Sequence, residues 1–409
     1  MDETPIRAVV EFDHTTPEYA ARAEEITADL RTRCPVAYSE SHDGFWIVTG
    51  YESLAASMRD ESTFSSRHLT AEDGVRFGGV NIPEAPYENA LVEMDPPEWN
   101  AFRRVLNPMF APAAIARLHP ALAEFTNTAI DACVQSGSID FVLDLANPVP
   151  AQATLAFLGL ELDDWPRFAE PAHEVVYTRP GTPEFQRAVE GQQWMFETLA
   201  KAVIDRRERP RDDNLSRIVH ADIERPFTDE EIVSLLGTII NGGVDTTTAL
   251  FANAIEYLDR NHRLRDQLIA RPELLPSATE EFLRYFSPVQ AFARTVAADT
   301  ELGDQVLRRG DRVLMSFASA NRDAEEFTDA DEFLLDRQPN RHVAFGMGKH
   351  RCIGSTLARA EFMTMLETTL RRMPDYRIVR SDTERYPSLG IVNGYVRMPA
   401  RFTPGVASS

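Results

Sequence analysis

The 409-residue sequence contains only three cysteines, and they lie far apart in the chain. Cys34, Cys133 and Cys352 form no CxxC pair, which excludes a disulfide framework and a four-cysteine zinc or iron–sulfur site built within the chain. Runs of about 18 uncharged apolar residues, which a transmembrane helix needs, are also missing. Because the first residues carry acid and no apolar signal segment, we expect a protein of the reducing cytoplasm that has no membrane partner.

Positive charge is in short supply as well. The chain has 42 Lys and Arg residues against 64 Asp and Glu residues, so its formal net charge at pH 7 is −22. This charge repels phosphate backbones and anionic membrane surfaces, so we expect neither nucleic-acid binding nor membrane association. Hydrophobic residues make up 43% and charged residues 26%, as in globular proteins generally. Length alone favours two or three domains.

A long helix is predicted from Thr228 to about Asp259. Thr228 and Glu231 form a capping-box pattern, and apolar residues then recur at helical spacing. The middle of this segment, however, holds Gly242, Gly243 and three consecutive threonines. Each glycine costs about 1 kcal/mol of helix stability relative to alanine, so a function other than helix stability is indicated. The alternative is a helix bent by glycine, with threonine hydroxyls bonded back to carbonyls one turn earlier.

The rest of the pattern is mainly helical with a small share of strand. The run 205–213 (DRRERPRDD) is interpreted as a charged loop on the surface. The other elements that we expect are strands at 45–49 and 312–315, a loop over 70–93, helical structure over 98–135 with a break at Pro112, two helices within 166–200 around a turn at 180–183, and helices over 276–286 and 355–372.

The segment 345–354, FGMGKHRCIG, places Cys352 just ahead of the last predicted helix. Unpaired N–H groups at a helix start favour an anion, and Lys349, His350 and Arg351 add positive charge, so both effects favour the thiolate form. The glycines of the segment allow a backbone to approach closely. A thiolate in this setting is either a nucleophile or a metal ligand.

This segment matches FGxGxHxCxG in every fixed position and resembles the cysteine loop of the cytochrome P450 family. The resemblance implies that Cys352 is the axial thiolate ligand of the iron of heme b. It further implies that Phe345 packs against the heme on the cysteine side and that His350 contacts a heme propionate. Gly346 and Gly354 occupy the fixed glycine positions of the loop.

The glycine and threonine segment of the long helix resembles the family motif [A/G]GxDTT. The resemblance implies that the glycine pair, Gly242 first, makes room for O₂ beside the heme. Asp245 and Thr246 are then expected to form an acid–alcohol relay that holds water and passes protons.

Two arginines are expected at the heme propionates, because a guanidinium matches a carboxylate geometrically. Arg103 ends a segment that resembles the family pattern DPPxHxxxR, although Trp99 stands where relatives carry histidine, and a contact of Trp99 with a propionate is left open. Arg294, in FARTV, resembles the second propionate arginine; the alternative is a surface arginine.

A third motif is Glu281–Phe282–Leu283–Arg284, which resembles the family ExxR motif. Most acid–base pairs at this helical spacing are surface ion pairs. By the resemblance, this pair is structural and is joined by Arg337.

The resemblance covers essentially the whole chain and implies one mainly α domain over residues 1–409, with a small β region and a long helix crossing the heme. The implied function is a soluble, bacterial-type, cytoplasmic monooxygenase. It would activate O₂ and hydroxylate or epoxidise a hydrophobic small molecule: a terpenoid, fatty acid, steroid or aromatic compound. The alternatives are a heme-thiolate sensor without oxygenation and a peroxide-driven peroxygenase; the presence of Asp245 and Thr246 argues against both.

Electrons are expected from NAD(P)H through a separate reductase and ferredoxin, because the two remaining cysteines are too few for an iron–sulfur cluster. We expect a basic surface that docks an acidic ferredoxin. The residues expected in it are Arg341, Lys349, Arg351, Arg359, Arg371 and Arg372. The substrate pocket is expected to take residues from 70–93, 166–200, 289–292 and 391–392, and from the helix face of Ile239, Gly242 and Thr246.

Overall fold

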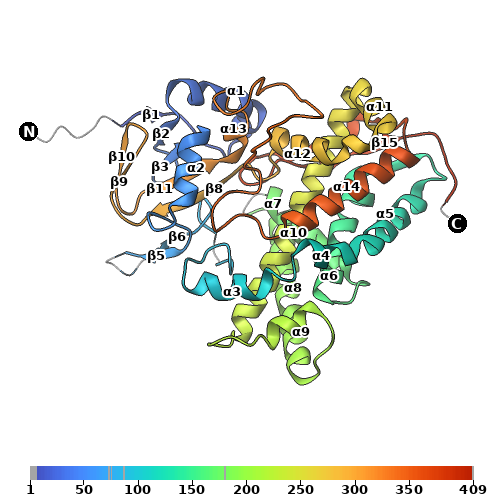
Figure 1. The fold of residues 1–409 in the computed structure, drawn as a ribbon, viewed down its shortest axis with the longest axis horizontal. Coiled ribbons are helices and arrows are strands. Elements are labelled where there is room, and N and C mark those ends of the chain that lie inside the picture. The colour runs from blue at the N-terminus through green and yellow to red at the C-terminus, as the bar shows by residue number, and fades with distance from the viewer. Residues whose placement is uncertain (1–6, 72–73, 75, 86–87, 179–180, 408–409) are drawn as a thin grey trace, which may run out of the picture. The chain divides into compact units, whose positions relative to one another are not determined.

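The computed structural model describes residues 7–71, 74, 76–85, 88–178 and 181–407 (Figure 1). Residues 72–73, 75 and 86–87 of the predicted loop, and Pro180 of the predicted turn, lie outside this part of the chain. The chain divides into two compact units, each assembled from separate stretches of sequence. The first comprises Met1–Trp99, Glu280–Cys352 and Pro387–Asn393, and the second comprises Asn100–Thr279, Ile353–Tyr386 and Gly394–Ser409. The single-domain organisation stays a prediction.

The first unit is built on a six-stranded sheet in the order β1-β2-β3-β11-β8-β4. The strands are β1 (Val9–Val10), β2 (Val36–Ser39), β3 (Phe45–Val48), β4 (Phe64–Ser65), β8 (Ala291–Val296) and β11 (Arg312–Ser316). β3 and β11 are parallel, whereas β8 pairs with β11 in antiparallel fashion. The strands predicted at 45–49 and 312–315 are thereby confirmed.

Both faces of this sheet are covered, which explains why all four residues of β3 are buried. Trp46 and Val48 pack into a cluster with Leu54 and Met58 of helix α2 (Tyr51–Arg59). Phe45 and Ile47 point the other way, into a cluster with residues of helix α1 (Pro17–Arg33). Figure 1 shows α2 lying across the sheet. The unit also contains the hairpins β5 (His68–Thr70)–β6 (Arg76–Gly78) and β9 (Thr300–Leu302)–β10 (Gln305–Leu307), helix α13 (Phe317–Ala320) and residues 280–286 of helix α12 (Leu275–Phe286).

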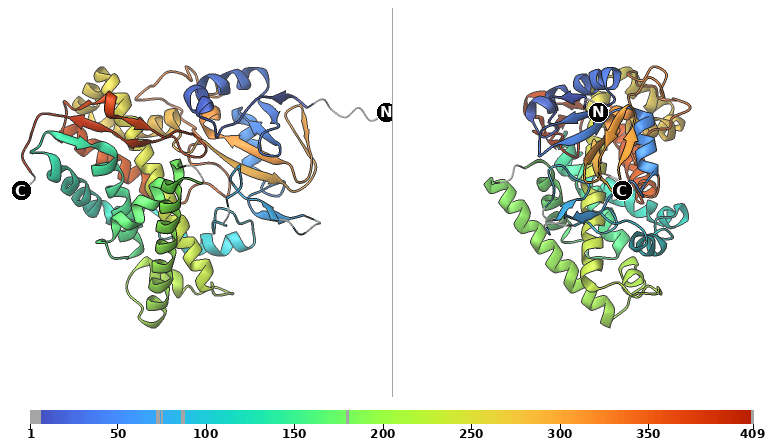
Figure 2. Two further views of the ribbon diagram at one scale, coloured as in Figure 1. Left: turned by 180° about the vertical axis from the view of Figure 1, so that it is seen from behind. Right: turned by 90° about the vertical axis from the view of Figure 1, so that its left-hand side faces the viewer.

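The second unit is helical, with helix α10 (Asp229–Arg260) in its core. α10 packs against α6 (Pro148–Leu158), α7 (Trp165–Tyr177), α8 (Pro183–Glu208) and α14 (Ser355–Arg372), and α8 lies beside α10 in Figure 2. The other helices are α3 (Glu98–Leu106), α4 (Pro112–Ile115), α5 (His119–Cys133), α9 (Asn214–Val219) and α11 (His262–Ala270). The short strands are β7 (Ser138–Asp140), β12 (Arg377–Ile378), β13 (Glu384–Arg385), β14 (Tyr395–Arg397) and β15 (Pro399–Arg401).

The predicted long helix is confirmed almost to the residue. Thr228 caps α10, and both hydrogen bonds of the capping box with Glu231 are present. α10 remains helical through Gly242 and Gly243, and the hydroxyls of Thr246 and Thr248 donate to the carbonyls of Gly242 and Val244 one turn earlier, as the alternative reading of this segment expects. The two glycines differ in their surroundings. A Cβ atom at Gly243 would lie 2.7 Å from Oγ1 of Thr154 on α6, whereas no described atom lies within 4 Å of one at Gly242.

The interpretation of 205–213 as a charged surface loop is wrong in part. α8 continues to Glu208, and Arg206 is buried. Its guanidinium donates to Asp205, to Asp213 and to the carbonyl of Gly159. Because these three acceptors surround Arg206, this one residue of the run is buried in an ion-pair network, while most of its charged neighbours are exposed.

Two smaller expectations also change. Pro112 begins a helix, α4, and the break in the helical region 98–135 lies before it. The predicted loop 70–93 contains the strand β6. The stretch Phe141–Leu158 is long and apolar enough to cross a membrane by length and composition, although it includes Asp144, and 78% of it is buried in the structure. That degree of burial is typical of a core helix.

Candidate functional site

The loop that carries Cys352 is shaped by two glycines with left-handed backbone angles, φ 66° at Gly346 and 63° at Gly348. A side chain at Gly348 is sterically excluded, because its Cβ atom would lie 2.4 Å from the carbonyl oxygen of Met58. The N–H of Cys352 donates to the carbonyl of Phe345 at 2.8 Å, which folds the loop back on itself. This geometry leaves the Cys352 side chain exposed.

The three cysteines differ in their surroundings. Burial raises the pKa of the Cys133 thiol to about 11 and also raises the pKa of Cys34, so both are neutral thiols at pH 7. Within the described residues, no three His, Cys, Asp or Glu side chains are grouped so that they could hold a metal ion.

Helix α3 and the cysteine loop meet at an aromatic contact. The ring centroids of Trp99 and His350 are 5.6 Å apart, with the planes tilted by 55°. Trp99 is buried. The neighbouring Lys349 forms an ion pair with Glu61. Trp99 thus packs on His350, the residue expected at a propionate.

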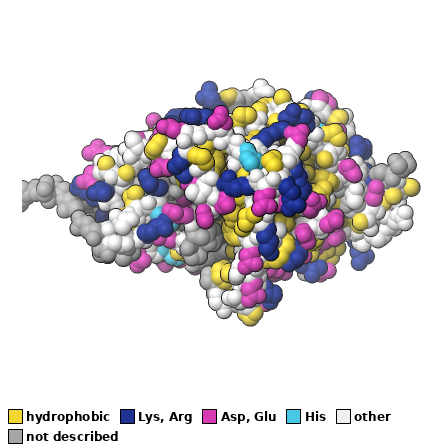
Figure 3. Space-filling model, turned by 90° about the horizontal axis from the view of Figure 1, so that it is seen from below, with side chains coloured by type: hydrophobic (Ala, Val, Ile, Leu, Met, Phe, Trp, Pro, Cys, Tyr) yellow, Lys and Arg dark blue, Asp and Glu magenta, His cyan; other side chains and the backbone are white. Residues whose placement is uncertain are grey.

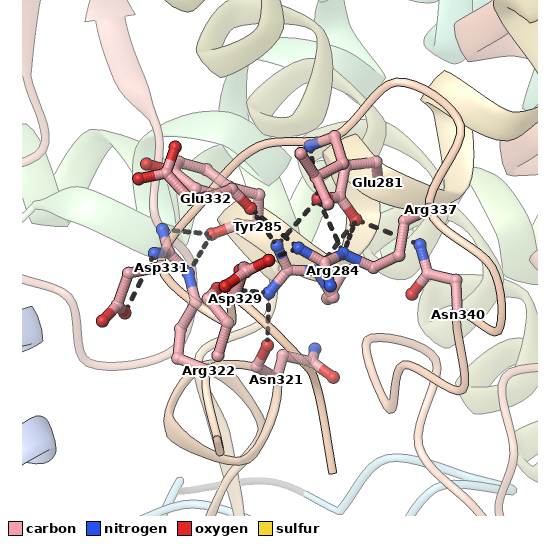
Figure 4. Close-up of polar contacts among 12 residues, drawn as sticks. Glu281, Arg284, Tyr285, Asn321, Arg322, Asp329, Asp331, Glu332, Arg337 and Asn340 are labelled. Carbon is pink, nitrogen blue, oxygen red and sulfur yellow. Dashed lines mark hydrogen bonds and ion pairs between the residues drawn. The ribbon is translucent and has the colours of Figure 1, made fainter. Parts of the chain in front are cut away.

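Figure 4 shows the polar cluster that includes the buried carboxylate of Glu281, which lies beside Arg284 and Arg337. Arg284 donates to both of its oxygens at 2.8 Å, and Nε of Arg337 donates to them at 3.0 and 3.1 Å. The N–H of Leu334 and Nδ2 of Asn340 complete the set of donors. Glu281 and Arg284 are both 0% exposed. The expected triad with Arg337 is confirmed, and Leu334 and Asn340 are additions to it.

Electrostatics explain why the charge on Glu281 is tolerated. Burial raises the pKa of the Glu281 carboxyl, but hydrogen bonds from Arg284, Leu334 and Arg337 outweigh burial, so the net pKa lies below its ordinary value of 4.5. The remaining donors of Arg284 reach the carbonyls of Asn321, Ala330 and Glu332. Through these hydrogen bonds, Arg284 also fixes the backbone between residues 321 and 337.

The cluster continues toward the cysteine loop through Asn321. Its Oδ1 accepts the N–H of Val343 at 2.7 Å, two residues before Phe345. Its Nδ2 donates to Oγ of Ser287 at 2.8 Å. The position of the chain that enters the cysteine loop is thus set by side-chain hydrogen bonds from the Glu281 cluster.

Arg294, on β8, is a buried cation that is 5% exposed. Its NH1 donates to the carbonyl of Ala293 at 2.7 Å, and no carboxylate of the described residues lies within ion-pair distance. Burial lowers the pKa of its guanidinium to about 10, although the charge of Asp95 acts in the opposite direction. A buried guanidinium requires an anionic partner, so this position fits the carboxylate of a bound molecule. The alternative of a surface arginine is wrong.

Asp245 and Thr246, the two residues of the expected relay, have different hydrogen-bond partners. Thr246 donates its hydroxyl to the carbonyl of Gly242 at 2.9 Å. The carboxylate of Asp245 is instead hydrogen-bonded to Tyr386 and His173 at 2.6 and 2.7 Å. Of the described residues, neither Asp245 nor Thr246 donates a hydrogen bond to the other. The two side chains are adjacent in sequence but have separate partners.

A second buried acid touches α10. Glu361 of α14 faces Thr247, and burial raises the pKa of its carboxyl well above 4.5, although the contact with Thr247 acts in the opposite direction. Sequence reasoning missed Glu361 as well as His173 and Tyr386. His173 lies 72 residues and Tyr386 141 residues from Asp245, and no local pattern signals such pairs.

The expected site residues are distributed over both units. Those in the first unit are Phe345, Gly346, His350, Cys352 and Arg294, and those in the second are Arg103, Gly242, Asp245, Thr246 and Gly354. Arg103 lies half-buried on α3, and Gly354 is the N-cap residue of α14.

The expected basic surface is only partly present. The side chain of Arg372 is 11% exposed and forms an ion pair with Asp131. Arg372 is therefore not part of a surface patch, which corrects the prediction. Arg341 and Arg351 are exposed. On the face drawn in Figure 3, acidic and basic side chains are interspersed.

Comparison with known proteins identifies the family. A family model described as Cytochrome P450 matches residues 168–374. A steroid C26-monooxygenase of Mycolicibacterium smegmatis is 32% identical, covering 93% of both chains. The chain belongs to the cytochrome P450 family. A nocardicin C N-oxygenase of Nocardia uniformis is 34% identical over an alignment that covers 88% of this P450 and 89% of the N-oxygenase.

Solved P450 structures share the fold. CYP109E1 from Bacillus megaterium in complex with testosterone superposes with a TM-score of 0.83 at 29% identity, covering 95% of this chain and 99% of that one. Mycobacterium marinum CYP268A2 in complex with pseudoionone superposes with a TM-score of 0.86 at 26% identity, covering 97% of this chain and 100% of that one. The mainly α fold with a small β region is confirmed. The protein is a P450 oxidoreductase whose cofactor is heme b.

The Glu281 cluster of this P450 generates a stability prediction. Glu281→Gln keeps the size of the side chain but leaves Arg284 and Arg337 buried without their anion, which is expected to cost about 3–5 kcal/mol of unfolding free energy at pH 7. Because the pKa of Glu281 is lowered on folding, its contribution is complete above pH 4.5 and is lost as pH falls below that value. Urea unfolding at several pH values measures both effects.

The matched control is Glu280→Gln, one residue away. Glu280 hydrogen-bonds to His342, and its side chain is 31% exposed, so its replacement is expected to cost less than about 1 kcal/mol. Equal losses for the two variants would contradict a special role for Glu281.

Proposed function

We propose that this P450 inserts one atom of O₂ into a C–H or C=C bond of a hydrophobic small molecule. The observation that carries the proposal is the loop 345–354, in which every fixed position of the family pattern is present and Cys352 is exposed. When bound, heme b supplies the iron at which O₂ is activated. The residues of this chain then hold the heme, orient the substrate and deliver protons.

In this proposal Cys352 is the thiolate ligand, and Gly346 and Gly354 give its loop and the following helix their shape. Arg294 holds one propionate, which supplies the anion that its buried guanidinium lacks among the described residues. Arg103 and His350 hold propionate oxygens as well. Phe345 packs on the cysteine side of the heme.

α10 is proposed to supply space and protons. Apart from its chain neighbours and the nearby backbone of α10, no described atom lies within 4 Å of the point that a Cβ atom would occupy at Gly242, which supports a role in leaving room for O₂. Thr246 uses its hydroxyl hydrogen on the carbonyl of Gly242, so its oxygen is left to accept a hydrogen bond from water. Asp245 is the acid that exchanges protons with this water.

For the substrate, we propose a bulky hydrophobic molecule, with steroids as the first class to test and terpenoids as the second. Three of the relatives are steroid C26-monooxygenases, 31–32% identical to this chain. One P450 of similar structure is known in complex with testosterone and with corticosterone. A terpene-type relative, cytochrome P450-terp of a Pseudomonas species, is 30% identical.

Electrons are proposed to come from NAD(P)H through a separate reductase and ferredoxin in the cytoplasm. The other two cysteines, Cys34 and Cys133, are too few for a cluster within this chain. The exposed Arg341 and Arg351 beside or within the cysteine loop offer positive charge to an acidic partner.

The ligand assignment predicts a spectrum. Reduced, CO-bound protein is expected to show the strongly red-shifted Soret band of thiolate-ligated heme, and Cys352→His is expected to move the band to the position of neutral-ligand heme. The control Cys133→Ser leaves the band in place, because that thiol is neutral. A wild-type band at the neutral-ligand position would withdraw the monooxygenase proposal.

The substrate class predicts which ligands bind. In a titration of the ferric protein with steroids, terpenes, fatty acids and aromatic acids, a steroid is expected to give the low-to-high-spin shift with the lowest Kd. A larger apolar surface is buried by the four-ring skeleton, so its Kd is expected to be roughly 10-fold below that of aromatic acids. A full shift with fatty acids alone would overturn the steroid assignment.

The docking surface predicts a kinetic effect. Arg351→Glu is expected to slow reduction by an acidic [2Fe–2S] ferredoxin roughly 10-fold at low salt, with heme content unchanged. Arg309→Glu is the control, since Arg309 is an exposed arginine in the turn between β10 and β11 of the same unit. Unchanged reduction rates for Arg351→Glu at low salt would exclude this surface.

A further inference from the structure

Asp245 lies in a buried cluster with two residues that no sequence motif indicates. Its Oδ1 atom accepts a hydrogen bond from the hydroxyl of Tyr386 at 2.6 Å and lies 2.7 Å from Nδ1 of His173. The hydroxyl and Nδ1 are themselves 3.0 Å apart. His173 comes from α7, and Tyr386 follows β13. All three side chains are buried, Asp245 being 1% exposed.

The chemistry of the three groups fixes which atoms donate. An ionised carboxylate only accepts hydrogen bonds, so Nδ1 of His173 carries the hydrogen that faces Asp245. Burial, followed by the charge of Asp245, raises the pKa of Tyr386 well above 10, so its hydroxyl keeps its proton at pH 7. The Tyr386 hydroxyl is therefore a donor to Oδ1 at neutral pH.

The other carboxylate oxygen has a different environment. Oδ2 of Asp245 is buried, and none of the described residues donates a hydrogen bond to it. A buried carboxylate oxygen without a donor is unfavourable, so it is a binding position for a mobile donor such as water. The cluster thus distinguishes the two oxygens: Oδ1 accepts hydrogen bonds from Tyr386 and His173, and Oδ2 accepts none from the described residues.

We propose that His173 and Tyr386 are positioning residues that hold Asp245 through Oδ1, so that Oδ2 is the oxygen that exchanges protons. In one exchange, an O–H bond of a hydrated proton breaks as the O–H bond on Oδ2 forms; the Oδ2–H bond then breaks as the proton passes to the water held by Thr246, which returns the carboxylate, and both hydrogen bonds to Oδ1 remain. The inference rests on the proposed relay function of Asp245 and names the residues that orient it.

The chain offers a matched pair of variants. Tyr386→Phe removes one donor to Oδ1 and keeps the ring. Tyr177→Phe removes a hydroxyl from the ring that stacks on Tyr386 at a centroid distance of 5.1 Å, and no hydrogen bond links Tyr177 to Asp245 in the described part of the structure. The two variants delete the same atom from adjacent rings.

With NADPH, reductase, ferredoxin and a spin-shifting ligand, Tyr386→Phe is expected to lower kcat roughly 10-fold, because a misdirected carboxylate loses proton-transfer efficiency. KM and heme content stay unchanged, and a larger share of the electrons ends in hydrogen peroxide. Tyr177→Phe changes kcat less than about 2-fold. His173→Gln, whose amide can still donate, is expected to retain more activity than His173→Phe.

A spectroscopic readout is independent of turnover. In the ferrous, CO-bound protein labelled with [¹⁵N]histidine, the Nδ1–H of His173 is expected as a slowly exchanging, downfield proton signal that His173→Gln removes. Tyr386→Phe and Asp245→Asn shift this signal, and Tyr177→Phe leaves it in place.

The possible outcomes distinguish the positioning function of His173 and Tyr386 from the relay function of Asp245 on which it rests. Unchanged kcat in Asp245→Asn would overturn the relay function of Asp245 and, with it, this inference. A loss of kcat in Asp245→Asn, combined with Tyr386→Phe and His173→Phe variants that behave like Tyr177→Phe, would overturn only the positioning function of His173 and Tyr386.

Discussion

Neutralisation of one buried carboxylate organises the chain that leads to the cysteine loop. Glu281 receives two arginines, a backbone N–H and an amide, and the arginines in turn bind carbonyls along residues 321–337. Charged groups with no access to water must find partners, so every one of these contacts constrains the backbone around it. The hydrogen bond between Asn321 and Val343 connects these contacts to the chain that enters the loop 345–354 and so helps to fix its position.

The same requirement accounts for what the sequence could and could not predict. Local signals were sufficient for α10, where the capping box and the apolar spacing gave its start and end, and for the strands β3 and β11. Arg337 was predictable because the family pattern names it. Arg206 was not, because its burial depends on Asp213 and on a carbonyl 47 residues away. The composition of a segment shows how many charged residues it contains but not which of them form ion pairs in the folded protein.

The candidate site shows the same division. The cysteine loop is one continuous stretch of sequence, and so is the glycine and threonine segment of α10. Each pattern could therefore be read directly from the sequence. The partners of Asp245 come from α7 and from the end of β13, and only the folded chain brings them to α10. Sequence therefore predicted which acid is present, and structure was needed to show which of its oxygens is engaged. Buried Glu361, whose pKa burial raises beside Thr247, was missed for the same reason.

The four residues of β3 belong alternately to two apolar clusters on opposite faces of the sheet. Trp46 and Val48 pack on one side, and Phe45 and Ile47 on the other. An insertion or deletion of one residue within β3 would exchange the two sets and disrupt both cores at once. The length of this segment is consequently under stricter constraint than its composition, because one aliphatic residue can replace another whereas a shift in register cannot be compensated locally.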